Sequence, residues 1–308
     1  MLNHVLNPKN REALYDDIRQ NCNVSLDKGI YIELNLNYTD ISHLKTLCED
    51  YILKTLKSYY VMDFKKNNFL VKYRDKILHL PNRAPSGAFY PKVENVKEYN
   101  RIQSFVNDIL NKNNLVNQFK SFDLTTVRVV DGQTTDLDSR VSSTTRLHSD
   151  AWAGHDGDAI LTIGLLGDKN TSTEFNKIIG NISPLFYETQ PDYVKGLQTF
   201  KKYEHISNLK FDNATIFDHT CLHRTLKTNG GLRVSIDIGI TLKSSDGVSK
   251  TKKYGRVMKK IKIKDILKIG KETIVEATET LKECRVRFKD DKYDKIPITY
   301  IHDTIKIG

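Results

Sequence analysis

The spacing of hydrophobic and polar residues divides the chain into an N-terminal helical part and a later part with strand patterns. Residues 30–36 alternate between apolar and polar with a period of two, which predicts a strand. From Ile41 onward, apolar residues recur every three or four positions as far as Leu56, which predicts a helix capped by Asp40 or Ser42. Asn95 and Glu98 have the spacing of a capping box, so a second helix is expected there.

Short strand patterns dominate after residue 120. They cover residues 124–130, 146–152, 159–166, 214–217, 221–226 and 232–242. Short strands separated by turns are typical of a sandwich or barrel, so the fold class is mainly β, with the N-terminal helices buttressing one sheet. Residues 168–212 have few regular signals and are expected to form a lid or binding loop. After residue 244, a strand near 261–264, a helix at 272–283 and a strand within 296–307 predict an α+β extension.

Composition is that of a folded protein, with 39% hydrophobic and 28% charged residues in 308. The longest nearly continuous apolar stretch, 159–167, is too short to span a membrane. The first 17 residues contain no apolar signal-peptide core, and the four cysteines are scattered. We therefore expect reduced thiols, no membrane association and a cytoplasmic location.

The net charge of +10 is concentrated at the C-terminal end. Residues 249–308 contain 17 Lys and Arg against 9 Asp and Glu, whereas residues 1–248 are nearly balanced. This predicts two parts, a domain at 1–248 and a basic extension at 249–308. A basic extension is most often a solvated surface, but it also suits a phosphorylated substrate or a nucleic acid.

Three residues have the spacing of metal ligands. His148 and Asp150 are two positions apart, so on a strand both side chains would lie on one face. His223 is a suitable third ligand from a later strand. Two histidines and one carboxylate that leave positions open suit a mononuclear non-haem Fe(II) oxygenase.

A receptor for a carboxylate is predicted beside this site. The sequence Thr-Asn-Gly-Gly at 228–231 predicts a hairpin that returns Arg233 and Ser235 to the His223 strand. Val234, Ile236, Ile238 and Ile240 would lie on the opposite, apolar face. An arginine beside a hydroxyl binds a carboxylate through charge and hydrogen bonds.

These motifs resemble those of the Fe(II)/2-oxoglutarate-dependent dioxygenases, which combine H-x-D…H with a later R-x-S. Residues 147–154 (LHSDAWAG) and 216–237 (IFDHTCLHRTLKTNGGLRVSID) are also similar to oxygenases of streptomycin-biosynthesis and carbohydrate-modification clusters. The resemblance implies a double-stranded β-helix (jelly-roll) core over about residues 120–243. It also implies that His148, Asp150 and His223 bind Fe(II) and act in catalysis, while Arg233 and Ser235 bind 2-oxoglutarate.

The implied reaction consumes O2, releases succinate and CO2, and oxidises a small molecule of specialised or carbohydrate metabolism. Because Asp150 is present, hydroxylation is favoured over halogenation, in which a small residue replaces the carboxylate. Desaturation, ring closure and epimerisation stay open.

Four further residues are candidates for the site. Thr173 is a candidate to hydrogen-bond the co-substrate from a neighbouring strand. Trp152, Arg146 and Arg128 are candidates for substrate binding, against packing or ion-pair roles.

Three alternative functions remain. A cupin-type isomerase would need clustered histidines and a glutamate. A nucleic-acid or protein-modifying dioxygenase would use the basic extension, but such demethylases usually have a second arginine soon after the first, and here Lys243 is the next basic residue. Nucleic acid is therefore an unlikely partner. A non-catalytic binding protein on the same fold is disfavoured by the intact set of ligands.

Overall fold

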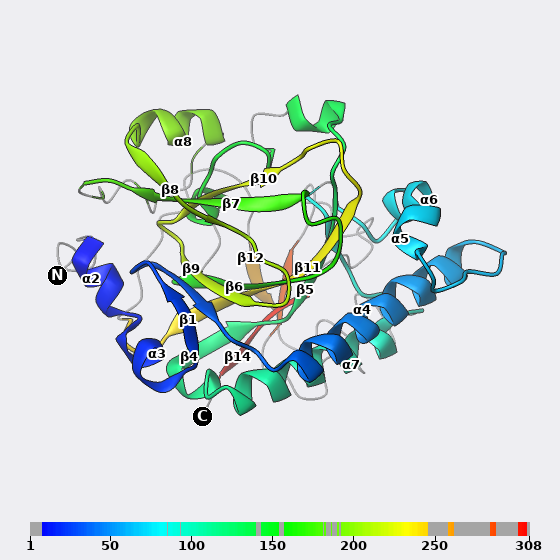
Figure 1. Cartoon of the computed structure of the whole chain (residues 1–308), viewed down its shortest axis with the longest axis horizontal. Coiled ribbons are helices and arrows are strands. Elements are labelled where there is room, and N and C mark those ends of the chain that lie inside the picture. The colour runs from blue at the N-terminus through cyan, green and yellow to red at the C-terminus, as the bar shows by residue number, and fades with distance from the viewer. Residues whose placement is uncertain are drawn as a thin grey trace.

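The computed structural model describes residues 8–84, 86–92, 94–139, 143–153, 157–180, 182, 186, 190, 192–245, 258–261, 284–287 and 301–306. Within these residues the architecture is mainly antiparallel β, with helices against one sheet, as the sequence predicts (Figure 1). No helix in this part of the chain combines the length and the apolar run needed to cross a bilayer.

The larger sheet has eleven strands, and its main path runs β1-β2-β9-β6-β11-β4-β14-β13-β12. The strands β3 and β5 lie off this path, because β5 pairs with both β11 and β3. The bounds are β1 Val24–Asp27, β2 Tyr31–Leu34, β3 Ala88–Phe89, β4 Phe119–Asp123, β5 Thr126–Asp131, β6 Ala159–Gly167, β9 Ala214–Asp218, β11 Leu232–Leu242, β12 Met258–Ile261, β13 Cys284–Arg287 and β14 Ile301–Lys306.

The smaller sheet has three strands in the order β10-β7-β8. Its members are β7 Ser172–Ile178, β8 Tyr203–Asn208 and β10 Leu222–Leu226. It lies above the larger sheet in Figure 1. Residues of both sheets line one pocket, which therefore lies between the two sheets.

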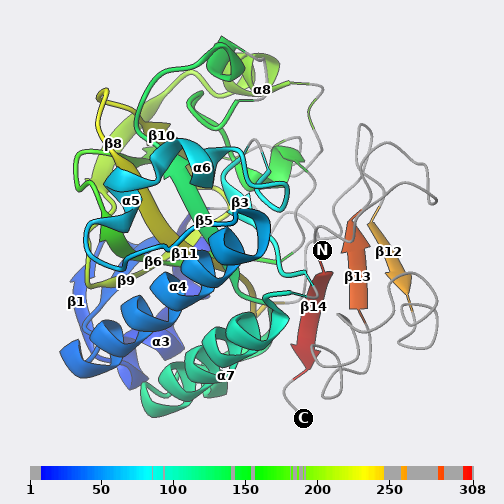
Figure 2. The same ribbon diagram turned by 90° about the vertical axis from the view of Figure 1, so that its right-hand side faces the viewer.

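Two long helices cover the larger sheet on the face away from this pocket. They are α4 Tyr38–Tyr59 and α7 Val96–Lys112, which lie side by side (Figures 1 and 2). The apolar stripe of α4, including Ile41, Leu44 and Ile52, packs into one core with the sheet. The predicted stripe is thus confirmed, but α4 begins earlier than expected because Asn37 accepts the capping hydrogen bond from Thr39 N.

The remaining helical elements are short. They are α2 Pro8–Ala13, α3 Asp16–Asn21, α5 Phe69–Lys72, α6 Arg74–Leu78, α8 Tyr193–Thr199 and the 3-10 turns η1 Val116–Gln118, η2 Asp136–Ser139 and η3 Asp150–Ala153.

The two faces of β11 differ as its sequence predicts. Val234, Ile236 and Ile238 are buried in the main core beneath α4 and α7. Arg233 and Asp237 face the pocket between the sheets. The period of two in β11 therefore places its polar residues at the site.

The predicted hairpin at 228–231 is wrong. β10 pairs with β7 in the smaller sheet, whereas β11 pairs with β4, β5 and β6 in the larger one. The connection crosses between the sheets, where Gly231 N donates to Asp168 and Gly231 O accepts from Thr171. These hydrogen bonds fix residues 228–231 against the segment between β6 and β7. The connection therefore joins two sheets instead of two neighbouring strands.

Two other predicted segments differ from the structure. Residues 146–152 contain only an isolated bridge at His148, followed by η3, where a strand was expected. Residues 168–212 contain β7, α8 and β8, where an irregular loop was expected. The strand β7 was not predicted because its sequence, Ser-Thr-Glu-Phe-Asn-Lys-Ile, is largely polar and its burial does not alternate regularly.

The C-terminal extension contributes strands to the described chain. β14 pairs with β4, and β13 and β12 follow it outward (Figure 2). The helix expected at 272–283 lies outside the described residues, and the division of the chain at residue 248 stays a prediction.

Candidate metal centre

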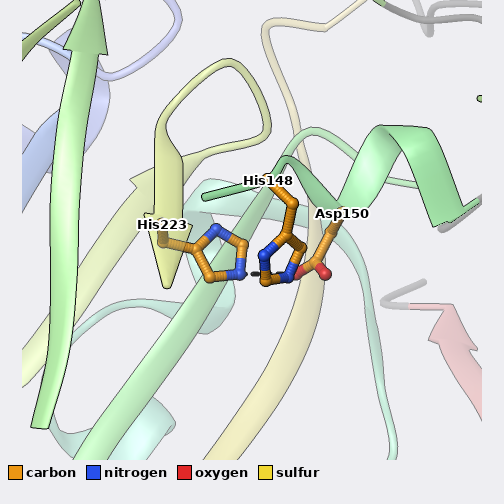
Figure 3. A group of neighbouring side chains, drawn as sticks. All are labelled: His148, Asp150 and His223. Carbon is orange, nitrogen blue, oxygen red and sulfur yellow. Dashed lines mark ion pairs between the residues drawn. The ribbon is translucent and has the colours of Figure 1, made fainter. Parts of the chain in front are cut away.

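Three side chains from two chain segments meet at one end of the pocket. His148 and His223 form a two-residue antiparallel bridge, in which each backbone N–H donates to the other's carbonyl at 3.0 and 2.8 Å. Asp150 begins η3 just after this bridge. The bridge sets the two imidazoles side by side, and the turn into η3 brings the carboxylate to them, as Figure 3 shows.

The donor atoms of these three side chains lie close enough to share one ion. One ligand atom from each of His148, Asp150 and His223 lies within 4.8 Å of the other two. His223 Nε2 lies 3.7 Å from Asp150 Oδ2, and the two imidazole centroids are 4.4 Å apart. A metal with bonds of about 2.0–2.2 Å to nitrogen and oxygen fits between atoms at such separations. The predicted grouping of these three side chains is present, although their residues come from a bridge and a turn.

The ring of His148 is held with one nitrogen available. Its Nδ1 lies 2.7 Å from the carbonyl oxygen of Arg146. Because a carbonyl only accepts, Nδ1 carries the proton and Nε2 keeps its lone pair. Burial, and then the neighbouring His223, lower the pKa of His148 to about 3. His148 is therefore a neutral imidazole at neutral pH, the form that binds metals.

Ser149 fixes the turn between the two ligands of the H-x-D motif. Its side chain is fully buried, donates to the carbonyl of His219 and accepts from Ala151 N at 3.1 Å. These bonds link residues 148–150 to the turn that precedes His223. The serine thus ties the two segments of the site together away from the donor atoms.

Arg233 places a buried positive charge in the same pocket. It is 2% exposed, and its Nη1 donates to Thr173 Oγ1 at 2.8 Å. Among the described residues no carboxylate forms an ion pair with it, and its Nε has no hydrogen-bond partner. Burial, and then the charge of Arg128, lower the pKa of Arg233 to about 10, so it stays charged at neutral pH. A buried cation without a counter-ion favours binding of an anion.

Arg128, by contrast, has a carboxylate partner. Its Nη1 donates to Asp237 Oδ2 at 2.9 Å, and its Nη2 donates to the carbonyl of Ser86. Thr162 donates to the other oxygen of Asp237. Arg128 lines the pocket, but its charge is already balanced by Asp237.

The pocket between the sheets includes most of the predicted site residues. It is lined by Arg128, Thr144, His148, Asp150, Ile160, Thr162, Thr173, Phe175, Phe217, His223, Thr225, Arg233 and Asp237. Ser235 is 1% exposed on the same strand but is not among the lining residues.

Arg146 and Trp152 lie outside the lining. Arg146 donates to the carbonyl of Ser139, and Trp152 is buried in an apolar cluster with Phe186 and Phe200. The substrate-binding roles considered for them thus have no support from the pocket, and the position of Trp152 matches its packing alternative.

Comparison with known proteins gives matches among solved structures alone. No protein-family model and no curated protein matches the chain. The non-heme alpha ketoglutarate dependent carbocyclase SnoK from nogalamycin biosynthesis matches with a TM-score of 0.43 and 10% identity, over 76% of this chain and 84% of that one. EctD from S. alaskensis, solved with 2-oxoglutarate and 5-hydroxyectoine, matches with a TM-score of 0.38 and 11% identity, over 79% and 80%. The epimerase SnoN from nogalamycin biosynthesis has a TM-score of 0.35 and 12% identity, over 75% and 81%. All three TM-scores are below 0.5, so the function proposed below rests on the geometry of the site.

Several residues at the site were not predicted from the sequence. Asp237 was assigned no role, although its period-two spacing from Arg233 on β11 was the available signal. Tyr193 stacks on the His148 ring with centroids 4.2 Å apart and an interplanar angle of 10°. It comes from α8, within a segment read as irregular, and no sequence signal connects it to the site.

Proposed function

We propose that this protein is an Fe(II)- and 2-oxoglutarate-dependent oxygenase that hydroxylates a small molecule. The observation that carries this proposal is the combination in one pocket of a His-Asp-His donor set and a buried arginine without a counter-ion. Two imidazoles and one carboxylate leave room on a six-coordinate metal, which suits Fe(II) rather than a closed structural zinc site. We also infer that the two sheets form the double-stranded β-helix of the resembling family.

The three ligand side chains fit such an ion. His148 Nε2, His223 Nε2 and an oxygen of Asp150 would hold it, and the hydrogen bond from His148 Nδ1 to Arg146 O keeps the first of these in the required tautomer. A bound Fe(II) ion supplies the activation of O2 and the oxidation of substrate, coupled to conversion of 2-oxoglutarate into succinate and CO2. The protein residues hold, orient and shield the reactants.

Arg233 would bind the carboxylate of 2-oxoglutarate that lies far from the metal. Its planar guanidinium matches a carboxylate with two parallel N–H donors, and its Nε–H is available for this. Thr173 orients the guanidinium through its hydroxyl, and Ser235 is the second candidate donor on β11. An anion of this kind would also remove the cost of burying the Arg233 charge.

The proposal is tested by mixing metal-free protein with Fe(II) and 2-oxoglutarate without oxygen and recording the visible spectrum. We expect the charge-transfer band of a 2-oxoglutarate chelate in the wild type, and its loss in His148→Ala with the fold retained. His205→Ala is the matched control, because His205 is exposed on β8 and lies outside the donor set. If folded, iron-loaded wild type gives no band, or His148→Ala keeps it, the assignment fails.

The substrate is then sought by measuring succinate release with candidate small molecules. Succinate formation that depends on a substrate, Fe(II) and 2-oxoglutarate supports the proposed reaction. A chelate band without turnover on any candidate would favour a binding role on the same fold.

A further inference from the structure

The outer face of the His148 ring is covered by a side chain that does not line the pocket. Tyr193, at the start of α8, lies flat on the imidazole, with centroids 4.2 Å apart and planes 10° from parallel. Tyr193 is 9% exposed and belongs to an apolar cluster that includes Leu147 and Trp152. This cluster packs over residues 147–152, the segment that contains two of the three proposed ligands.

The placement of Tyr193 depends on a close contact between α8 and Trp152. A Cβ added to Gly196 would lie 2.6 Å from the Trp152 ring, so the helix approaches the indole as closely as a glycine allows. Gly196 and Tyr193 are three residues apart and therefore share a face of the helix. The N-terminal end of α8 is fixed by Asp192, whose side chain accepts from Lys195 N at 2.7 Å.

An imidazole ligand needs two restraints to aim its lone pair. The hydrogen bond from Nδ1 to Arg146 O restrains rotation of the His148 ring about its Cβ–Cγ bond, but a single hydrogen bond still tolerates some tilt of the ring. A flat contact on the face of the ring opposes this tilt. The other ring beside His148 is that of His223. Its plane is inclined at 49° to the His148 ring, with centroids 4.4 Å apart, so it does not supply a flat contact.

We propose that Tyr193 is a positioning residue for the metal centre, which sets the plane of the His148 imidazole by stacking on it when α8 is docked on Trp152. This inference rests on the proposed function, because it assumes that His148 binds a metal. It extends that function by assigning a part in metal affinity to α8, which begins 43 residues after Asp150.

The test is a titration of metal-free protein with Co(II), whose visible ligand-field bands report the geometry around the ion. We expect Tyr193→Leu, which keeps apolar volume but removes the ring, to weaken Co(II) binding about tenfold, as loss of a residue that orients a ligand does. We also expect its Co(II) bands to shift. Tyr193→Phe keeps the stacked ring, so it should retain the Co(II) affinity and the spectrum of the wild type. Val194→Ala, a change at the exposed neighbouring position, is the matched control.

Gly196→Ala provides a second variant in which Tyr193 is intact. The added methyl group would push α8 away from the indole. Since Trp152 is the sole tryptophan of the chain, its emission reports this movement without any metal. We expect the Trp152 emission of Gly196→Ala to shift. We also expect its Co(II) affinity to fall, as in Tyr193→Leu.

The outcomes separate the inference from the function on which it rests. If wild type binds Co(II), and Tyr193→Leu and Gly196→Ala both bind it with wild-type affinity and spectrum, Tyr193 has no positioning role and the inference fails alone. If affinity falls equally in Tyr193→Phe and Tyr193→Leu, stacking is not the cause and the inference also fails. If folded wild type binds no Co(II), the proposed function fails and the inference with it.

Discussion

A buried guanidinium normally lies beside a carboxylate, and Arg233 differs from Arg128 in this respect. Arg128 pairs with Asp237, whereas Arg233 donates to the neutral hydroxyl of Thr173. Both arginines line the same pocket. In this pocket the charge of Arg128 is balanced by Asp237, whereas the charge of Arg233 has no ion-pair partner among the described residues. Arg233 therefore favours binding of an anionic ligand.

Replacing Arg233 with lysine tests this assignment. Lysine keeps the positive charge but loses the paired N–H donors, so we expect 2-oxoglutarate binding to weaken by about tenfold or more. The measurement is the concentration of 2-oxoglutarate that half-saturates the chelate band under anaerobic conditions. Arg224→Lys, on β10 and paired with Glu174 outside the pocket, should leave that concentration unchanged. An unchanged value in Arg233→Lys would remove Arg233 from the co-substrate site.

The hydroxyl of Thr173 is predicted to matter for stability as well as for binding. Thr173→Val keeps the shape but leaves Nη1 of buried Arg233 without its acceptor, which should lower the free energy of unfolding by about 1–3 kcal/mol. Thr225 is its direct partner on β10 and also lines the pocket, but its hydroxyl makes no hydrogen bond among the described residues. Thr225→Val is therefore the control, and denaturant unfolding of the two variants gives the comparison. Equal stabilities would contradict the orienting role of Thr173.

Residues of the site differ in how far the sequence could predict them. His148, Asp150, His223 and Arg233 belong to a spaced motif, because the same few chemical types must meet around one ion and one carboxylate. Tyr193 acts through a ring face, and any part of the chain that passes nearby can supply an aromatic ring. Its role is visible only once α8 is placed.

At the scale of elements, the pattern predicted the strands better than their partners. The alternation in 232–242 gave both the bounds and the buried face of β11. The glycine-rich segment before it predicted a hairpin between β10 and β11, and that prediction is wrong. The residues of a turn do not show which distant segments will form hydrogen bonds with it. Here Asp168 and Thr171 form hydrogen bonds with Gly231, and the chain continues into the other sheet.

The end of β6 shows how closely the strands at the site approach. Gly167 has a φ of +94° and pairs with Arg233, and an added Cβ would collide with the carbonyl of Leu232. We expect Gly167→Ala to lower the free energy of unfolding by more than about 2 kcal/mol, because the cost of a positive φ at alanine adds to the cost of the clash with the Leu232 carbonyl.

Gly180→Ala is the control for this change. Gly180 has a similar φ of +97°, but an added Cβ would meet no atom within 4 Å. Its cost should therefore be limited to backbone strain, about 1 kcal/mol. Thermal or denaturant unfolding distinguishes the two variants, and equal losses would mean that the approach of β6 to β11 is not tight.

At the scale of the whole molecule, a buried ionic network joins segments that are far apart in the sequence. Arg11 of α2 donates to Asp218 Oδ2 through Nε and Nη2, at 3.0 and 2.6 Å, and Tyr15 donates to the same oxygen. Asp158, beside it, accepts from Ser245 after the end of β11. Hydrophobic periodicity could not predict this network, since its members are polar residues that lie inside the fold.

The network also reaches the metal centre. Asp218 Oδ1 accepts from the backbone N–H and the hydroxyl of Thr220, which shapes the turn before His223. The carbonyl of His219 in this turn accepts from Ser149, between the two other ligands. The N-terminal helix α2 therefore supports both ligand segments, although it lies outside the predicted jelly-roll range.

Arg11→Met is predicted to be one of the more destabilising single changes in the protein. It would leave the carboxylates of Asp218 and Asp158 buried without their cation, and breaking one partner of a buried pair costs about 3–5 kcal/mol. Lys66→Met removes an exposed ion pair with Glu49 and should cost less than about 1 kcal/mol. Denaturant unfolding of both variants gives the comparison.

Because the turn before His223 depends on Asp218, Arg11→Met should also weaken Co(II) binding where it still folds. A variant as stable as Lys66→Met, with wild-type Co(II) affinity, would show that the N-terminal helix packs on the core without supporting the metal centre.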